Sequence, residues 1–141
     1  MSITPAQTLI AVDFGLKNMG LAVGNTVSRT ATPLTVIKAR DGVPDWEHIV
    51  RLVEEWRPTR VIVGHPLNMD GSDSELSARA ERFARQLEAR LKLEVVLVDE
   101  RLSSRDAKQM ALASGHSGDF FSDPIDDQAA ALILETYLSE L

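Results

Sequence analysis

The chain has 141 residues, which is enough for one domain with a hydrophobic core and too few for two. Of these residues 44% are hydrophobic and 26% charged, which is typical of a globular protein. It contains no cysteine, which excludes disulfide bonds, thiolate zinc sites, iron–sulfur clusters and a cysteine nucleophile. Its formal net charge of −6 argues against a module that binds nucleic acid through a broad basic surface, but it is compatible with an enzyme that holds phosphates through carboxylate-bound metal ions.

The first half of the chain favours three strands and one helix. Leu9–Phe14 (LIAVDF) is a short apolar run that contains a carboxylate near its end, as expected of a buried strand. Gly20–Gly24 follows closely enough to form a hairpin with it, and β-branched residues predict a third strand at Thr30–Ile37. Asp45 can cap a helix with one apolar face, and Pro58 ends that helix.

The second half alternates strands and helices. Arg60–Gly64 (RVIVG) is apolar enough for a central strand, and the turn residues of Pro66–Gly71 (PLNMDG) predict a loop after it. Ser72 and Glu75 have the spacing of a capping box at the start of a long amphipathic helix. A fifth strand is predicted at Glu94–Val98.

The last part of the chain is predicted to be helical. Ser103 can cap a third helix that stops at Gly115, and residues 115–123 are predicted to form a loop. Asp123 followed by Pro124 predicts the start of a final helix. Three strands followed by alternating helices and strands favour an α/β domain. Its opening strands pair antiparallel, and its later strands join in parallel through helical crossovers.

Three acidic residues stand where predicted elements end or begin. Asp13 closes the first strand, Glu100 follows the fifth, and Asp126 lies in the first turn of the last helix. Ligands gather at the carboxyl ends of parallel strands, and carboxylates brought together there are stabilised by a hard cation such as Mg²⁺ or Mn²⁺. Each acid alone also has a structural explanation, as a turn residue, a solvated strand end or an acid favoured by a helix dipole.

Four segments give a more specific signal when they are taken together. In chain order they are Asp13–Ala22 (DFGLKNMGLA), Gly64–Gly71 (GHPLNMDG), Asp99–Ser103 (DERLS) and Ile125–Ala130 (IDDQAA). This set resembles the YqgF family of Holliday junction resolvases or pre-16S rRNA nucleases, which is related to the RuvC resolvases. The resemblance extends from about Leu9 to Leu138, and the PLNMDG and DERLS segments are its most specific parts.

The resemblance implies an α/β domain with a ribonuclease H-like fold. Its mixed five-stranded sheet has the order 3-2-1-4-5 with strand 2 antiparallel and helices on both faces, and residues 1–141 form this single nuclease domain. The resemblance also implies a metal-dependent nuclease. Asp13, Glu100 and Asp126 match the family's catalytic and metal-binding acids, with Mg²⁺ or Mn²⁺ as the cofactor.

The implied strand order leaves open which residue is the third acid. The first and fifth strands are separated by the fourth, so Glu100 follows a strand about 9–10 Å from that of Asp13. A glutamate with a bound ion bridges much of this distance. Asp70, in the loop after the fourth strand, is the alternative, although a residue before Gly71 is also an ordinary turn residue.

Lys17, Asn68 and Arg101 are the candidate substrate-binding residues. Their cationic and amide groups suit contacts to phosphates, although the loop that contains Asn68 is equally explained as a structured strand-to-helix turn. No pair of histidines has the spacing of metal ligands, and no catalytic role is assigned to His48, His65 or His116.

Three classes of function remain open at this point. The first is an endonuclease that matures the 5′ end of precursor 16S rRNA, with a ribosomal particle as a candidate partner and Holliday junction or other branched DNA as the alternative substrate. The second is a non-catalytic RNA-, ribosome- or transcription-associated module, which the acidic charge favours. The third, a phosphotransferase of the actin and sugar-kinase group, would need a second domain that 141 residues do not supply.

Localisation and assembly follow less directly from the sequence. No apolar stretch is long enough to cross a membrane, and residues 1–7 show no secretory signal, so we expect a cytoplasmic protein without a membrane partner. The oligomeric state, monomer or homodimer, is left open. A resolvase needs two sites related by a two-fold axis, whereas an rRNA nuclease does not.

Overall fold

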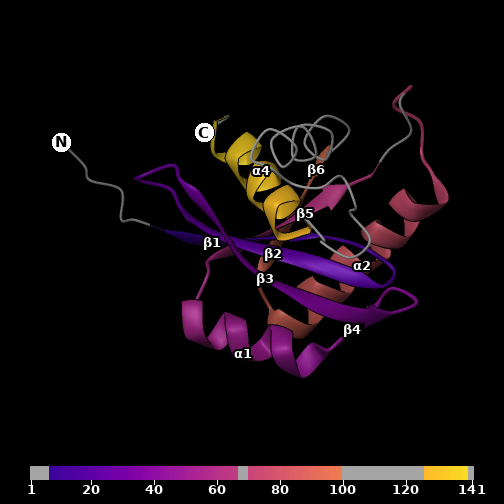
Figure 1. Ribbon diagram of the computed structural model, residues 1–141, viewed down its shortest axis with the longest axis horizontal. Coiled ribbons are helices and arrows are strands. Elements are labelled where there is room, and N and C mark those ends of the chain that lie inside the picture. Colours follow the sequence, from indigo (N-terminus) through magenta and orange to yellow (C-terminus); the bar gives the residue numbers. More distant parts are fainter. Residues whose placement is uncertain (1–6, 67–69, 100–125, 140–141) are drawn as a thin grey trace, which may run out of the picture.

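The computed structural model describes residues 7–66, 70–99 and 126–139. Within these residues the chain forms one twisted sheet with helices packed on it (Figure 1). The elements in chain order are β1 (Thr8–Asp13), β2 (Asn18–Asn25), β3 (Ala31–Arg40), β4 (Val43–Pro44), α1 (Trp46–Trp56), β5 (Arg60–His65), α2 (Glu75–Leu91), β6 (Glu94–Asp99) and α4 (Asp126–Ser139).

The sheet has the order β4-β3-β2-β1-β5-β6. β2 is antiparallel to both β1 and β3, whereas β1, β5 and β6 are parallel to one another. With β4 set aside, this is the predicted order 3-2-1-4-5 with an antiparallel second strand, so the fold prediction is confirmed. The buried apolar runs of β1 and β5 place these two strands in the centre, where helices cover both of their faces.

The sixth strand, β4, extends the predicted sheet at its edge. β3 runs to Arg40, three residues beyond the predicted end, and the chain then turns back through Asp41 and Gly42. Both turn residues have positive φ, 49° and 80°, the conformation that joins tightly paired strands. A two-residue strand has too few side chains to show a periodic pattern, which is why the sequence did not reveal it.

The first predicted helix is confirmed as α1. The Asp45 carboxylate accepts a hydrogen bond from the His48 backbone amide at 3.4 Å, and Ile49 and Leu52 are buried on its inner face. Arg57 leaves the helix in a left-handed conformation, and its amide donates to the Val53 carbonyl. The helix therefore ends before Pro58, as predicted.

The predicted capping box of α2 is wrong by two residues. Ser74 is the N-cap, and its hydroxyl and the Ser77 hydroxyl each accept a hydrogen bond from the other residue's backbone amide, at 2.9 and 2.7 Å. Ser72 instead donates its amide and hydroxyl to an Asp70 carboxylate oxygen, at 2.9 and 2.6 Å. This local turn uses the side chain of Ser72 and delays the start of the helix.

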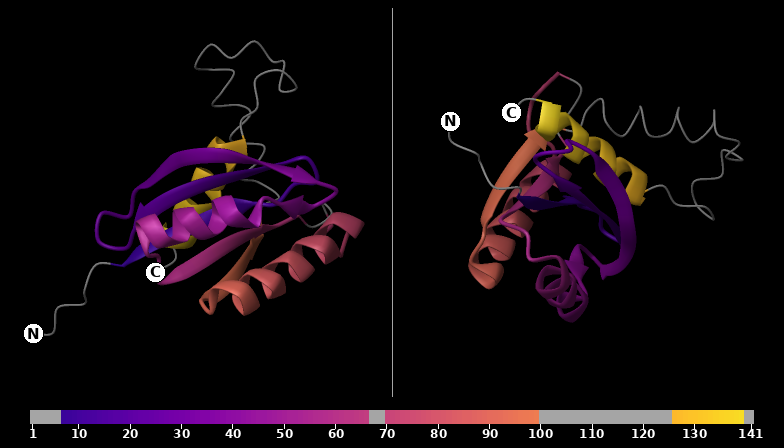
Figure 2. Two further views of the ribbon diagram at one scale, coloured as in Figure 1. Left: turned by 90° about the horizontal axis from the view of Figure 1, so that it is seen from below. Right: turned by 90° about the vertical axis from the view of Figure 1, so that its left-hand side faces the viewer.

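Helices cover both faces of the sheet (Figure 2). On one face, α1 and α2 enclose a core that contains Ile10, Val12 and Phe14. On the other, α4 packs on Leu9 and Ala11. Successive residues of β1 therefore alternate strictly between the α2 face and the α4 face, as the pleat of a strand requires.

Several predicted features lie outside the described residues. They are the third helix at 103–115, the loop at 115–123, and the candidate site residues Asn68, Glu100 and Arg101. Within residues 7–66, 70–99 and 126–139, none of the helices has the length and hydrophobicity that a membrane crossing requires.

Candidate functional site at the carboxyl edge of the sheet

Three parallel strands end with titratable residues at one edge of the sheet. Asp13 is the last residue of β1, His65 the last of β5 and Asp99 the last of β6. Val12 lies beside Val63, and His65 lies beside Asp99, so the three strand ends are nearly level. Ionisable residues therefore close all three parallel strands at this edge, and they divide between the two faces of the sheet.

Asp13 belongs to the α4 face of this edge. It follows Leu9 and Ala11 at two-residue intervals, and both of these pack against α4. Phe14, the next residue, lies in the core beneath α2. Asp13 is partly buried at this end of the sheet and is not without interaction partners.

The helix α4 runs antiparallel to β1 and begins at the same edge. Leu134 contacts the backbone at Gly24, which pairs with Leu9, and Ala130 packs with Ala22, which pairs with Ala11. Four residues of a helix span about 6 Å, and two residues of a strand span about 6.6 Å, so the two elements advance at nearly the same rate. Four residues before Ala130 is Asp126, the first residue of α4, and two residues after Ala11 is Asp13.

This register places the first residue of α4, Asp126, at the level of Asp13. At the other end of the helix, the Tyr137 hydroxyl accepts a hydrogen bond from Arg60, the first residue of β5, which fixes the helix direction independently. Asp126 also shares a helix face with Ala130 and Ile133, which are fully buried against the sheet. The side chain of Asp126 itself lies outside the described part of the structure.

The other candidates differ in what the structure shows. Lys17 is exposed in the connection between β1 and β2, which leaves the sheet at the Asp13 end, and its carbonyl accepts the Ala39 amide at 2.7 Å. Asp70, the alternative third acid, uses one carboxylate oxygen to hold the turn at Ser72. The explanation of Asp70 as a turn residue is therefore supported.

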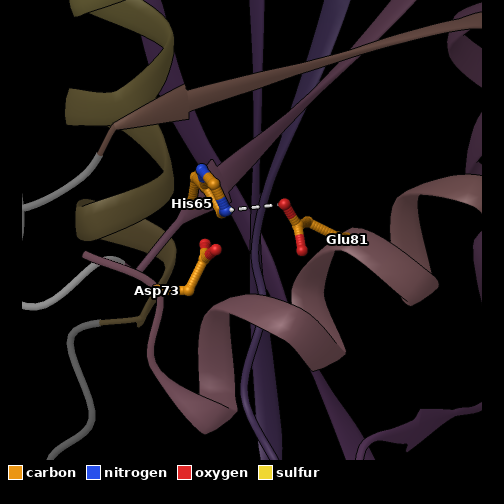
Figure 3. Close-up of side chains that lie close together, drawn as sticks. All are labelled: His65, Asp73 and Glu81. Atoms are coloured by element: carbon orange, nitrogen blue, oxygen red, sulfur yellow. Dashed lines mark ion pairs between the residues drawn. The ribbon is translucent and has the colours of Figure 1, made fainter. Parts of the chain in front are cut away.

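A second group of side chains at this edge was not predicted from the sequence. His65, Asp73 and Glu81 come together on the α2 face, with one ligand-type atom from each within 4.8 Å of the other two (Figure 3). His65 follows Val61 and Val63 at two-residue intervals, and both of these line the α2 face. Spacings of eight residues between loop and helix match no metal-ligand motif, so only the fold reveals the group.

The mixed sheet with helices on both faces, and an acid closing its first strand, defines a ribonuclease H-like domain. Two solved structures share this fold. The Fowlpox virus resolvase in complex with substrate Holliday junction DNA superimposes with a TM-score of 0.57 at 15% identity, covering 94% of this chain and 97% of that one. Thermus thermophilus RuvC in complex with a Holliday junction substrate gives 0.51 at 18% identity, covering 90% and 91%.

Sequence similarity to a family model and to relatives identifies the family of this chain. Residues 7–140 match the family model RuvX, described as a Holliday junction resolvase. A "Putative pre-16S rRNA nuclease" of Saccharophagus degradans is 47% identical over 132 residues, which are 94% of this chain and 93% of that protein. The protein of the same name from Hahella chejuensis is 51% identical over 131 residues, 93% and 83% of the two chains. The chain belongs to the RuvX (YqgF) family, and the predicted nuclease class is confirmed.

Proposed function

We propose that this protein is a metal-dependent endonuclease that hydrolyses phosphodiester bonds in structured nucleic acid, with the 5′ end of precursor 16S rRNA as its substrate. The observation that carries the proposal is the register between β1 and α4, which brings the start of that helix to the Asp13 end of the sheet. The names of relatives that are similar over most of their length support the choice of substrate.

The catalytic acids of the proposal are Asp13, Glu100 and Asp126. Val96 and Val98, near the end of β6, pack on the α4 face, which also carries Asp13, and Glu100 is assigned from its place in the sequence directly after this strand. Asp126 is assigned to the same face by the register of α4.

Three carboxylates are an all-oxygen donor set, which fits the preference of Mg²⁺ or Mn²⁺. Such ions, when bound, lower the pKa of water and neutralise charge on the phosphate in phosphodiester hydrolysis. The chain's own contribution is to hold the end of β1 and the start of α4 at one edge of the sheet. Asp13 is fixed by the paired ends of β1 and β2, and Asp126 by the apolar seat of α4.

Substrate contacts are assigned to Lys17, Asn68 and Arg101. Lys17 is exposed and follows Asp13 by four residues in the sequence. Its ammonium group can pair with a phosphate of a bound strand. With a net charge of −6, local cations of this kind, rather than a general basic surface, attract the nucleic acid. The proposal includes a cytoplasmic location, action as a single domain on a ribosomal precursor particle, and no need for a dimer.

The test compares cleavage of a precursor 16S transcript and a four-way DNA junction, side by side, with Mg²⁺ or Mn²⁺. We expect the wild type to cut the transcript and the Asp13→Asn variant to fold normally but lose metal-dependent cleavage. Glu54→Gln, an exposed carboxylate on α1, is the matched control and should retain full activity.

Each other outcome has a defined meaning. Undiminished cleavage by Asp13→Asn would refute the assignment of the site. Junction cleavage without transcript cleavage would replace the rRNA substrate by DNA, as the description of the family model suggests. Tight RNA binding without turnover at saturating Mn²⁺ would favour a non-catalytic module.

A further inference from the structure

The group formed by His65, Asp73 and Glu81 lies apart from the proposed catalytic acids. His65 ends β5, Asp73 precedes the N-cap of α2, and Glu81 lies two turns into that helix (Figure 3). The group is on the α2 face of the sheet, whereas Asp13 follows the residues of β1 that pack on α4. The sheet itself therefore separates the two places.

The histidine of this group has an unsatisfied nitrogen. The Nε2 atom of His65 is buried and makes no hydrogen bond with the described part of the chain, although the Glu81 carboxylate lies 3.4 Å away. The His65 side chain as a whole is 17% exposed. A buried imidazole nitrogen without a hydrogen bond is unfavourable, so a further partner at this atom would stabilise it.

The arrangement resembles the coordination shell of a small cation. Two ligands about 2.1 Å from a tetrahedral centre are about 3.4 Å from each other, which is the separation of His65 Nε2 and Glu81 Oε1. The third ligand, Asp73, is on an exposed residue, and the Ser77 hydroxyl donates to its carboxylate at 3.4 Å. The three ligand-type atoms lie within 4.8 Å of one another, so the exposed Asp73 side chain has to move closer to the other two to complete a three-ligand site.

We propose that His65, Asp73 and Glu81 bind one divalent transition-metal ion, such as Zn²⁺, at a site distinct from the catalytic acids. One imidazole nitrogen and two carboxylate oxygens suit Zn²⁺ better than Mg²⁺, which prefers oxygen ligands only. The ion fastens the end of β5 to the first turns of α2.

A second contact supports this structural role. The hydroxyl of Ser74 donates to the carbonyl of Pro66 at 2.7 Å, so the chain is already drawn together at the two ends of the connection between β5 and α2. The metal ion adds a stronger link at the same point.

The experiment is a Zn²⁺ titration of the full chain against a competing chelator, with Co²⁺ absorption as a second probe. With excess Mg²⁺ present to occupy the catalytic acids, we expect one Zn²⁺ ion per chain in the wild type and in Asp13→Asn, and an affinity at least about tenfold lower in His65→Asn and Glu81→Gln. His48→Asn, which removes a histidine on α1, is the matched control and should bind as the wild type does.

NMR of the His65 imidazole in the wild type tests the proposal without relying on a variant that folds. The imidazole ¹⁵N resonances of the wild type should show the Nε2 signal of His65 shifting on addition of one equivalent of Zn²⁺. Unchanged affinity in His65→Asn, or a His65 signal that Zn²⁺ does not move, would show an ordinary His65–Glu81 ion pair and overturn the proposal. Loss of Zn²⁺ binding in Asp13→Asn would also overturn it, because the ion would then belong to the catalytic acids.

Discussion

Replacement of Gly24 by alanine tests how tightly α4 is seated on the sheet. A Cβ atom at this position would lie 2.6 Å from the Thr30 carbonyl oxygen and 2.8 Å from Cδ2 of Leu134. Carbon atoms rest about 3.5–4.0 Å apart, so the contact with Leu134 must open by about 1 Å. Leu134 is fully buried and the Thr30 oxygen is backbone, so neither can move aside cheaply.

The magnitude follows from two opposing terms. Overpacking of a well-packed core costs about 1–3 kcal/mol, and the loss of glycine's freedom in the unfolded chain returns about 0.4–1 kcal/mol. The net expectation is a loss of about 1–2 kcal/mol in the free energy of unfolding, measured by urea titration. Cleavage should fall further than the folded fraction does, because a displacement of about 1 Å at a catalytic group can cost a hundredfold in rate.

A double variant identifies the contact responsible. Leu134→Val shortens the side chain that a new Cβ would meet, so Gly24→Ala combined with Leu134→Val should lose less stability than the sum of the two single changes. A change below about 0.5 kcal/mol in Gly24→Ala, or strict additivity in the double variant, would refute the close seat of α4 and, with it, the register that carries Asp126 to the level of Asp13.

Three further predictions concern other parts of the structure. Ser74→Ala should lower the free energy of unfolding by about 1–2 kcal/mol because it removes the α2 cap, whereas Ser72→Ala should change it by less than about 0.5 kcal/mol; urea titration measures both. Tyr137→Phe should cost about 0.5–1.5 kcal/mol through its lost hydrogen bond with Arg60. Hydrogen bonds with Glu94 and Tyr137 raise the pKa of Arg60 above the ordinary value of an arginine. The stability that a raised pKa contributes is lost only when the pH rises through the pKa of the folded state, far above neutrality, so thermal unfolding should show the same cost of Tyr137→Phe at pH 6 and pH 8. Lys17→Met should reduce the slope of log affinity for RNA against log salt by about 0.7, which a filter-binding series at several salt concentrations would show, while an unchanged slope would remove Lys17 from the phosphate contacts.

The sequence predicted those features that repeat along the chain. The apolar runs of β1 and β5 and the amphipathic pattern of α1 determine which segments are strands and helices, and short connections determine which of them pair. It failed where one local contact decided between alternatives. The carboxylate of Asp70 holds Ser72 in a turn, so the N-cap moves to Ser74, and no periodic pattern records this competition.

The site was predictable to the extent that it depends on strand ends. Asp13 could be placed because it terminates an apolar run, whereas the partners of His65 come from a loop and from a helix that crosses it. Which long-range pairs meet depends on the angle at which α2 packs, and side-chain spacing within the chain carries no information on that angle.

The alternation of a strand explains why one edge of the sheet can hold two different sites. Asp99 and Glu100 are neighbours in the chain, yet Val96 and Val98 pack on α4 while Val95 packs beneath α2. Alternation therefore gives Asp99 and His65 to the α2 face, and Val96 and Val98 to the face of Asp13. A one-residue shift in the register of β6 would exchange these assignments. His65 lies beside Asp99 in the pairing of β5 and β6, on the face opposite Asp13. Changes at His65 and at Asp13 should therefore act independently: those at His65 on metal binding beneath α2, and those at Asp13 on cleavage beneath α4.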